Sequence, residues 1–385
     1  MKQSLKPYFV YSPVMALALY VTVLGYMIPV MRGAFSLTLA QAGLFSTLQS
    51  VGTALSVLLC FTVFSALNQA RIMAFCSYAL FFVIVLIGIS QDLFIIYALF
   101  LLLGLFNNIT DTLSNSLIAD LSPQKKSYHI GLMQALWSAF GAAGPFFAML
   151  LGSDYMPVFL GLGVFTALCA LVFTFGLRSE IALPMMQKRH NIGGLNKLLR
   201  TLRRKGVKRY LAAAMLNSMV QLTVIYFVAS FVAECGGSSL QSAAALSAFF
   251  FGSMAGRLLY AKSLHRFPSR KVLPIASALA LAALAVMLLS TDPVIICITA
   301  GIGGFGLSMN FPAFIVELCG IVPDDTAAAS SLVFLGYTMA CFIAPPVFGA
   351  LGDALGLQTS MLIALTLLLP LILICLRLHS EPQPA

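Results

Sequence analysis

Long apolar runs follow one another along almost the whole chain, and they constrain the fold more than any other feature of the sequence. Each of twelve runs is about twenty residues long or longer, which is the length that a helix needs to cross a lipid bilayer. In lipid only helices and closed barrels satisfy every backbone polar group, and barrel strands would be short and alternating. The sequence therefore predicts an all-α integral membrane protein. Its predicted transmembrane segments are 8–31, 40–66, 70–90, 93–121, 127–151, 155–177, 210–233, 239–261, 271–290, 294–321, 326–350 and 357–376.

The composition argues against other classes of protein. Charged residues make up 9% of the chain, against about a quarter in soluble domains, and hydrophobic residues make up 60%. We find no nucleophile–base pair, phosphate-binding glycine loop or metal-ligand spacing, so we predict no enzyme, no catalytic residue, no metal and no cofactor. The eight cysteines lie mostly in apolar runs and are interpreted as packing residues. The first segment follows Lys2 and Lys6 without a cleavage site, and is interpreted as a retained helix.

The distribution of charge predicts an orientation in the membrane. With twelve spans the loops alternate between sides, and one side takes 21 of the 22 basic residues when Arg257, near the end of its helix, is included, so we expect both termini to be cytoplasmic. Only Arg32 falls on the other side, where the acidic residues are Asp92, Asp154, Glu234, Asp292 and Asp353. The net charge of +10 is then explained by contact with anionic lipid heads and not by nucleic acid. We expect a multi-pass protein of the cell membrane, or of the inner membrane in a bacterium.

The chain divides into two similar halves. A basic loop over 179–209 separates a six-helix bundle at 1–178 from a second at 210–385, and leucines at helical spacing in 195–202 predict an amphipathic surface helix. Several residues recur at an offset of 200, which indicates an internal repeat: Gly104 and Gly304, Pro123 and Pro323, Pro145 and Pro345, Gly152 and Gly352. Parallel repeats of this kind place a substrate site at their interface, near the middle of the bilayer.

A polar stripe interrupts the fourth apolar segment. Asn107, Asp111 and Asn115 follow one another at intervals of four residues and therefore share a helix face, with Asn108 and Ser114 beside them. An ionised carboxylate at this depth costs about 2.5–3.5 kcal/mol, so it needs a water-filled cavity or a partner. A carboxyl group facing such a cavity can load and release a proton. The alternative is that Asp111 is structural and hydrogen-bonds another helix.

Six plus six helices around a basic central loop resemble the major facilitator superfamily. "GRLLYAKSLHRFPSRKVL" (256–273) resembles the family's basic loop between the second and third helices of each half, and "FSLTLAQAGLFSTLQSVG" (35–52) resembles its second-helix entry. The first-half loop, "FSALNQARIM", lacks the family's glycine and aspartate. The resemblance implies two pseudo-symmetric bundles, transport by alternating access and a monomer.

A narrower resemblance is to the fucose permease type of proton-coupled sugar symporter. "DTLSN" followed by "GLMQALWSAFGAAGP" is similar to that group's fourth and fifth helices, although its acid in the first helix is missing here. The resemblance implies that Asp111 couples protons and that Asn115 and Gln134 bind substrate.

Further polar and aromatic residues lie in segments that line the cavity in that family. Each of them could instead serve packing. With the stripe, the substrate-binding candidates are Asn107, Asn108, Asn115, Gln134, Trp137, Asn217, Gln221, Asn310, Tyr337 and Gln49. The candidates for gating are Arg257, Arg270, Glu317 and Arg32.

Three functions remain open at this point. The first is a proton-coupled symporter of a small polar solute such as a sugar, driven by the proton gradient, with the solute, protons and membrane lipids as partners. The second is a proton-coupled exporter of amphipathic drugs, for which the 30 Phe and 17 Met would supply apolar surface. The third is a membrane receptor or sensor that binds a ligand without transporting it.

Overall fold

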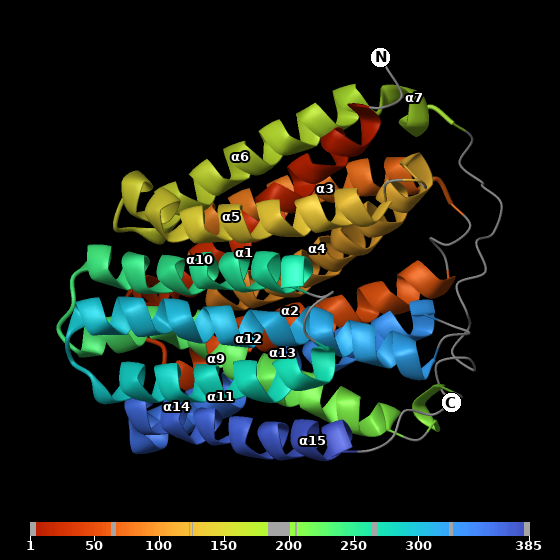
Figure 1. Cartoon of the computed structure of the whole chain (residues 1–385). Coiled ribbons are helices and arrows are strands. Elements are labelled where there is room, and N and C mark those ends of the chain that lie inside the picture. The colour runs from red at the N-terminus through yellow and green to blue at the C-terminus, as the bar shows by residue number, and fades with distance from the viewer. Residues whose placement is uncertain are drawn as a thin grey trace. The chain divides into compact units, whose positions relative to one another are not determined.

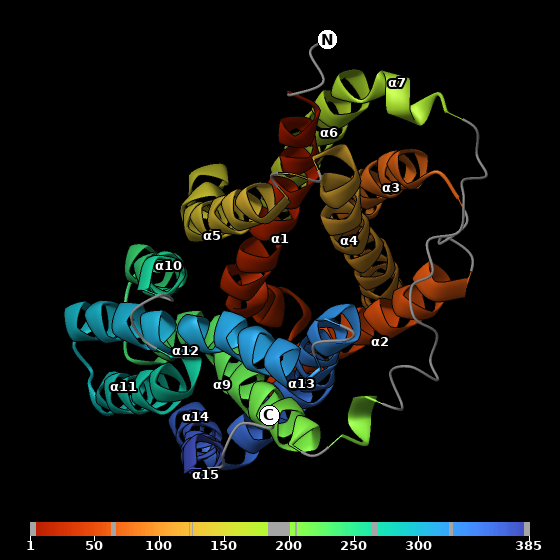
Figure 2. The same ribbon diagram turned by 45° about the vertical axis from the view of Figure 1, so that its right-hand side comes forward.

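The computed structural model describes residues 5–62, 67–122, 124, 126–183, 201–204, 206–263, 268–322 and 326–380. Its regular elements in these ranges are helices (Figures 1 and 2). Those of the first half are α1 (Lys6–Phe35), α2 (Leu39–Thr62), α3 (Gln69–Ile89), α4 (Leu93–Leu121), α5 (Lys126–Leu151), α6 (Tyr155–Gly176) and the short α7 (Arg178–Ile181). Those of the second half are α9 (Val207–Glu234), α10 (Ser239–Ser263), α11 (Ser269–Leu289), α12 (Pro293–Ile321), α13 (Thr326–Leu355), α14 (Leu357–Thr366) and α15 (Leu368–Ser380).

The predicted all-α class is confirmed. Within the described residues, eleven helical stretches are long and apolar enough to cross a membrane. The segment predicted at 40–66 corresponds to α2, and its last four residues lie outside the described ranges. Most of the predicted surface helix at 195–202 lies outside them as well.

The last predicted segment is not one regular helix. α14 ends at Thr366 and α15 begins at Leu368, so the helix expected over 357–376 is interrupted at Leu367. Pro370 explains the interruption, because it has no N–H for the carbonyl of Thr366 and its ring crowds that carbonyl. The Leu367 N–H instead bonds to the Ala364 carbonyl at 3.1 Å, which tightens the turn.

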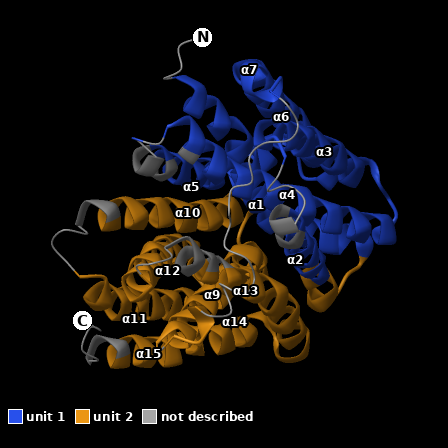
Figure 3. Cartoon of the chain, turned by 90° about the vertical axis from the view of Figure 1, so that its right-hand side faces the viewer, with its two compact units in different colours: residues 1–35, 44–192 blue, residues 36–43, 193–385 orange. Residues whose placement is uncertain are grey.

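The chain forms two compact units, coloured separately in Figure 3. Unit 1 comprises 1–35 and 44–192, and unit 2 comprises 36–43 and 193–385. The division in the middle of the chain falls inside the loop that the sequence analysis placed at 179–209. Residues 36–43 differ from the sequence-based boundaries, because they group with unit 2 although they lie early in the chain.

The internal repeat at an offset of 200 is confirmed by the helices themselves. α3 and α11 have equivalent bounds, as do α4 and α12. The start of α2 carries a capping box, in which Thr38 and Gln41 bond each other's backbone N–H, and Ser238 and Gln241 repeat it before α10. The two halves therefore share their local capping chemistry as well as their helix lengths.

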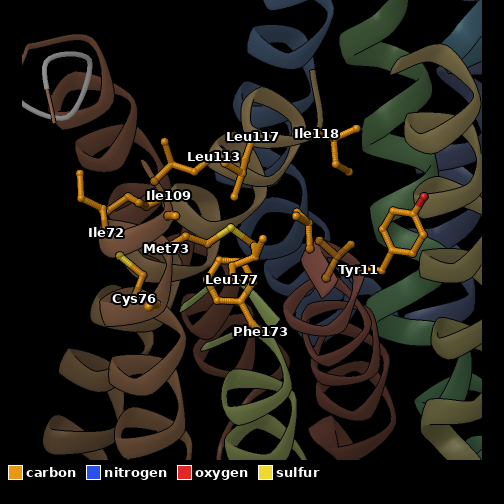
Figure 4. Close-up of a cluster of buried hydrophobic side chains, with 14 of the residues drawn as sticks. Tyr11, Ile72, Met73, Cys76, Ile109, Leu113, Leu117, Ile118, Phe173 and Leu177 are labelled. Carbon is orange, nitrogen blue, oxygen red and sulfur yellow. The ribbon is translucent and has the colours of Figure 1, made fainter. Parts of the chain in front are cut away.

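The core of unit 1 lies where α1, α3, α4 and α6 pack together. Figure 4 shows the buried cluster there, which includes Met73 from α3, Phe173 from α6, and Ile109 and Leu113 from α4. Ile109 and Leu113 each follow a stripe residue, Asn107 or Asp111, by two positions, which is about 200° around a helix. α4 thus presents an apolar face to the core and carries its polar stripe on the other side.

Candidate functional site

Two helices of unit 1 cross with almost no space between their backbones. A Cβ atom at Gly104 in α4 would overlap the carbonyl oxygen of Gln49 in α2, and one at Gly52 would overlap the carbonyl oxygen of Leu101. The same crossing recurs in unit 2, where a Cβ at Gly304 would overlap the Phe249 carbonyl. Glycine is required at these points because any side chain would push the helices apart.

This crossing places the polar residues of α2 against the stripe of α4. The Asn108 side-chain amide donates to the Ser56 hydroxyl at 2.6 Å. The Ser56 hydroxyl in turn donates to the Thr53 carbonyl at 2.6 Å, so Asn108 is tied to α2. Asn108, predicted to bind substrate, has at least one donor committed to interhelical packing.

Asp111 is half-buried on α4. Its backbone carbonyl accepts from the Ser114 hydroxyl at 2.7 Å and from the Asn115 amide at 2.9 Å. No residue in the described part of the chain forms a hydrogen bond or ion pair with the carboxylate itself. The structural alternative, an Asp111 bonded to another helix, therefore finds no partner among those residues.

Three amide side chains of unit 1 also carry polar atoms that make no hydrogen bond to a described residue. The side-chain oxygens of Gln49 and Asn107 are buried and have no hydrogen-bond partner among the described residues. Gln134, on α5, is half-buried, and its contact within the described chain is through its backbone carbonyl, to Ser138 at 3.2 Å. Trp137, one turn further along α5, packs against the hydrophobic cluster of Figure 4.

Two amide side chains of unit 2, unlike those of unit 1, are hydrogen-bonded to neighbouring helices. The Asn310 amide, on α12, donates to the Asn217 side-chain oxygen on α9 at 2.8 Å and to the Ser277 hydroxyl on α11 at 3.0 Å. The Asn217 amide donates to the Leu307 carbonyl at 3.3 Å. Asn310 is 0% and Asn217 1% exposed. In this structure both candidates therefore join three helices of the bundle.

The other unit 2 candidates are Gln221, buried on α9, and Tyr337, half-buried on α13. Arg257, a gating candidate, is half-buried on α10.

Two of the gating candidates form an ion pair within unit 2. Arg270 Nε lies 2.9 Å from Glu317 Oε2, with side chains 16% and 12% exposed. Tyr210 on α9 donates its hydroxyl to the same oxygen at 3.0 Å. The sequence analysis missed Tyr210, and nothing in its spacing distinguishes it from a packing tyrosine. Arg32, the last of the four, lies in the final turn of α1, where a cation is favoured by the helix dipole.

Sequence comparison identifies the family. The family model described as "Major Facilitator Superfamily" matches residues 14–244 and 210–385. The chain belongs to the major facilitator superfamily. It is therefore a multi-pass membrane transporter by family, and the predicted fold is confirmed.

Solved structures agree on the fold. A bacterial homologue of the human lysosomal transporter Spinster, in an inward-facing and unoccupied conformation, superposes with a TM-score of 0.80 at 16% identity, covering 100% of this chain and 99% of that one. The nucleoside transporter NupG superposes with a TM-score of 0.79 at 13% identity, covering 99% of this chain and 100% of that one. No curated protein sequence matches the chain significantly.

Proposed function

We propose that the protein is a secondary active transporter that works by alternating access and couples inward proton movement to the symport of a small polar solute such as a sugar. Both termini face the cytoplasm in this proposal, the proton gradient is the energy source, and the transporter acts as a monomer. Arg257, Arg270, Glu317 and Arg32 serve its gates.

The observation that carries the proposal is the carboxylate of Asp111. A carboxyl group in a membrane-spanning helix is costly unless it faces water, pairs with a cation or is protonated. Asp111 is half-buried, and its carboxylate has no protein partner among the described residues. Such a group alternates readily between its protonated and ionised forms, which is the property that proton coupling needs.

Other polar groups of unit 1 support a hydroxyl-rich solute. The unpartnered oxygens of Gln49 and Asn107 are hydrogen-bond acceptors, and the Gln134 amide supplies both donors and an acceptor. Buried acceptors without a partner are costly, and a solute or water that donates to them removes this cost. Sugars carry several hydroxyl donors. These polar groups favour this reading over an exporter of lipophilic compounds, whose site would need mainly apolar contacts.

The coupling is tested by Asp111→Asn in proteoliposomes with an imposed pH gradient, acidic outside. We expect the variant to lose gradient-driven accumulation of the solute and to keep solute exchange at equal pH, because the amide cannot carry the proton. Asp120→Asn is the matched control, since Asp120 is an exposed carboxylate on the same helix. Accumulation by Asp111→Asn at the wild-type level would exclude Asp111 as the coupling group.

The solute class is identified with Trp137, the only tryptophan of the chain. Its fluorescence is titrated with a panel of sugars, with a nucleoside, and with the lipophilic cation tetraphenylphosphonium, and Trp137→Phe confirms the source of the signal. The nucleoside is included because one structural neighbour is named a nucleoside transporter. A saturable response to one sugar supports the proposal, and a response to the cation alone favours the exporter. Saturable binding to a protein that shows neither uptake nor exchange would favour the receptor.

A further inference from the structure

A short helix that cannot be stable by itself follows α6 in unit 1. α7 has four residues, Arg178–Ile181, whereas an isolated helix shorter than about 12 residues is marginal in water even for favourable sequences. It begins after a break at Leu177, whose φ of −115° and ψ of 24° are not helical (Figure 2). Contacts with other elements must therefore hold α7 in place.

The start of α3 supplies most of these contacts. The Asn68 side-chain amide donates to the Glu180 carbonyl at 2.9 Å and to the Leu183 carbonyl at 3.2 Å. The Arg71 guanidinium donates to the Ile181 carbonyl through Nε at 3.1 Å and Nη2 at 2.9 Å, and through Nη2 to the Leu183 carbonyl at 3.2 Å. The last carbonyls of a helix have no partner inside it, so these bonds satisfy groups that α7 itself leaves open.

An ion pair and an apolar contact complete the attachment of α7. Lys6 Nζ, at the start of α1, lies 2.6 Å from Glu180 Oε1, with side chains 16% and 22% exposed. The Ile181 side chain packs against the hydrophobic cluster of Figure 4, in which Leu177 is fully buried. α7 thus closes this cluster at one end of α1, α3 and α6, on the side of the membrane that the charge distribution assigns to the cytoplasm.

The repeat does not provide this arrangement in unit 2. At the offset of 200, Asn68 corresponds to Pro268, which caps α11 without a side-chain hydrogen bond. α6 ends at Gly176, but its counterpart α15 continues to Ser380, past the position that corresponds to the break. The turn into α7 and its attachment to α3 are therefore additions of unit 1 and not requirements of the shared helix bundle.

Asn68 has two tasks at this point. It belongs with Arg71 to the first-half loop "FSALNQARIM", which lacks the glycine and aspartate of the family's basic loop. Its side-chain oxygen accepts the Arg71 backbone N–H at 3.1 Å and so caps α3, while its amide holds α7. One side chain that is 1% exposed thus joins α3 to a carbonyl 112 residues away in the sequence.

We propose that α7 is a strap that closes one end of the unit 1 core, that Asn68 and Arg71 fasten it to α3, and that it opens as a unit without unfolding of α3 or α6. Short segments that a few hydrogen bonds hold to a core open locally at a lower free energy than the core itself. When the strap opens, Ile181 leaves the hydrophobic cluster and Leu183 is released from α3. The proposal concerns unit 1 alone, and it depends neither on proton coupling nor on the transported solute.

Amide hydrogen exchange of the whole chain in detergent micelles, followed by mass spectrometry, tests the strap. The backbone N–H groups of Glu180, Ile181, Ala182 and Leu183 bond to carbonyls within 177–180, so their exchange reports the opening of α7. Peptides from α3 and α6 report whether the neighbouring helices open at the same time. The comparison of these peptides separates a local opening from unfolding of the core.

Asn68→Asp is the most specific variant, because its carboxylate still accepts the Arg71 N–H as a helix cap but cannot donate to the carbonyls of α7. We expect exchange over 180–183 to become about tenfold faster in this variant and in Arg71→Ala, while α3 and α6 keep their wild-type protection. Arg71→Ala carries the test if Asn68→Asp does not fold. Arg178→Ala is the matched control, since it removes an exposed cation from α7 itself.

Exchange over 180–183 that neither Asn68→Asp nor Arg71→Ala changes would overturn the strap. An equal acceleration in Arg178→Ala would also overturn it, since the effect would then be one of net charge. Faster exchange throughout α3 and α6 in the same variants would show that α7 unfolds only together with the core, and it would overturn the independent opening. The measurement uses neither a solute nor a pH gradient, so its outcome is separate from the test of Asp111.

Discussion

The buried pair of Asn310 and Asn217 gives the most direct test of how polar residues are used in unit 2. Asn310→Ala removes the donor of two hydrogen bonds, to Asn217 at 2.8 Å and to Ser277 at 3.0 Å. Ser277 keeps its own bond to the Leu273 carbonyl at 2.7 Å, so its hydroxyl stays satisfied. The Asn217 oxygen is the group that is left without this donor.

Three contributions set the size of the effect. A stranded buried acceptor costs about 1–3 kcal/mol in soluble proteins. Interhelical bonds in membranes are weaker, about 0.6 kcal/mol on average and about 1.7 at most, because the separated helices also find partners. The Asn310 side-chain oxygen has no hydrogen-bond partner among the described residues, and its removal offsets part of the loss. We therefore expect Asn310→Ala to lower the free energy of unfolding by about 1–2 kcal/mol.

A double-mutant cycle with Asn217→Ala isolates the pair. Reversible unfolding in mixed micelles gives the two single variants and the double variant, and we expect a coupling energy of about 1 kcal/mol. Because both side chains are buried in packing contacts, the affinity reported by Trp137 should stay at the wild-type value. A coupling energy below about 0.3 kcal/mol, within the usual error of additivity, would refute the reasoning. Loss of affinity without loss of stability would return both residues to the substrate site.

Two further predictions concern packing and charge. Gly104→Ala should destabilise the protein by about 1–3 kcal/mol, because the new methyl group meets the Gln49 carbonyl, whereas Gly33→Ala, which meets nothing within 4 Å, should be neutral in the same unfolding assay; equal effects would disprove the close crossing. Glu317→Gln should lower stability by about 1–2 kcal/mol and weaken its dependence on salt, because it leaves Arg270 without its ion pair; a salt dependence equal to that of the unsubstituted protein would show that this pair contributes nothing measurable.

The candidate site was predictable only in part. The spacing of Asn107, Asp111 and Asn115 marks a polar helix face in any environment, since three polar residues at intervals of four need no knowledge of neighbours. The same reasoning applied to Asn217 and Asn310 could not tell a ligand-binding amide from a packing amide. What distinguishes a packing amide is its hydrogen-bond partner, and in the described structure the Asn310 amide donates to the Asn217 oxygen, 93 residues away in the sequence.

Capping shows the same limit. Thr38 and Gln41 form a capping box whose bonds span only three residues and are therefore local. Asp353 was assigned to the outer side by its position between apolar segments, but its bonds to Leu39 and Ala40 were not predicted. No local pattern connects an aspartate to a helix start at such a separation.

The sequence by itself determined the class of the protein, its helices and its repeat. The length and hydropathy of each segment decide whether it prefers lipid, and lipid permits little besides a helix, so these properties follow from local chemistry. The tertiary structure decided which polar groups are used in packing, where α2 passes from one unit to the other, and which carboxylate caps it. Those outcomes depend on contacts between residues far apart in the chain, and such contacts exist only once the helices have packed.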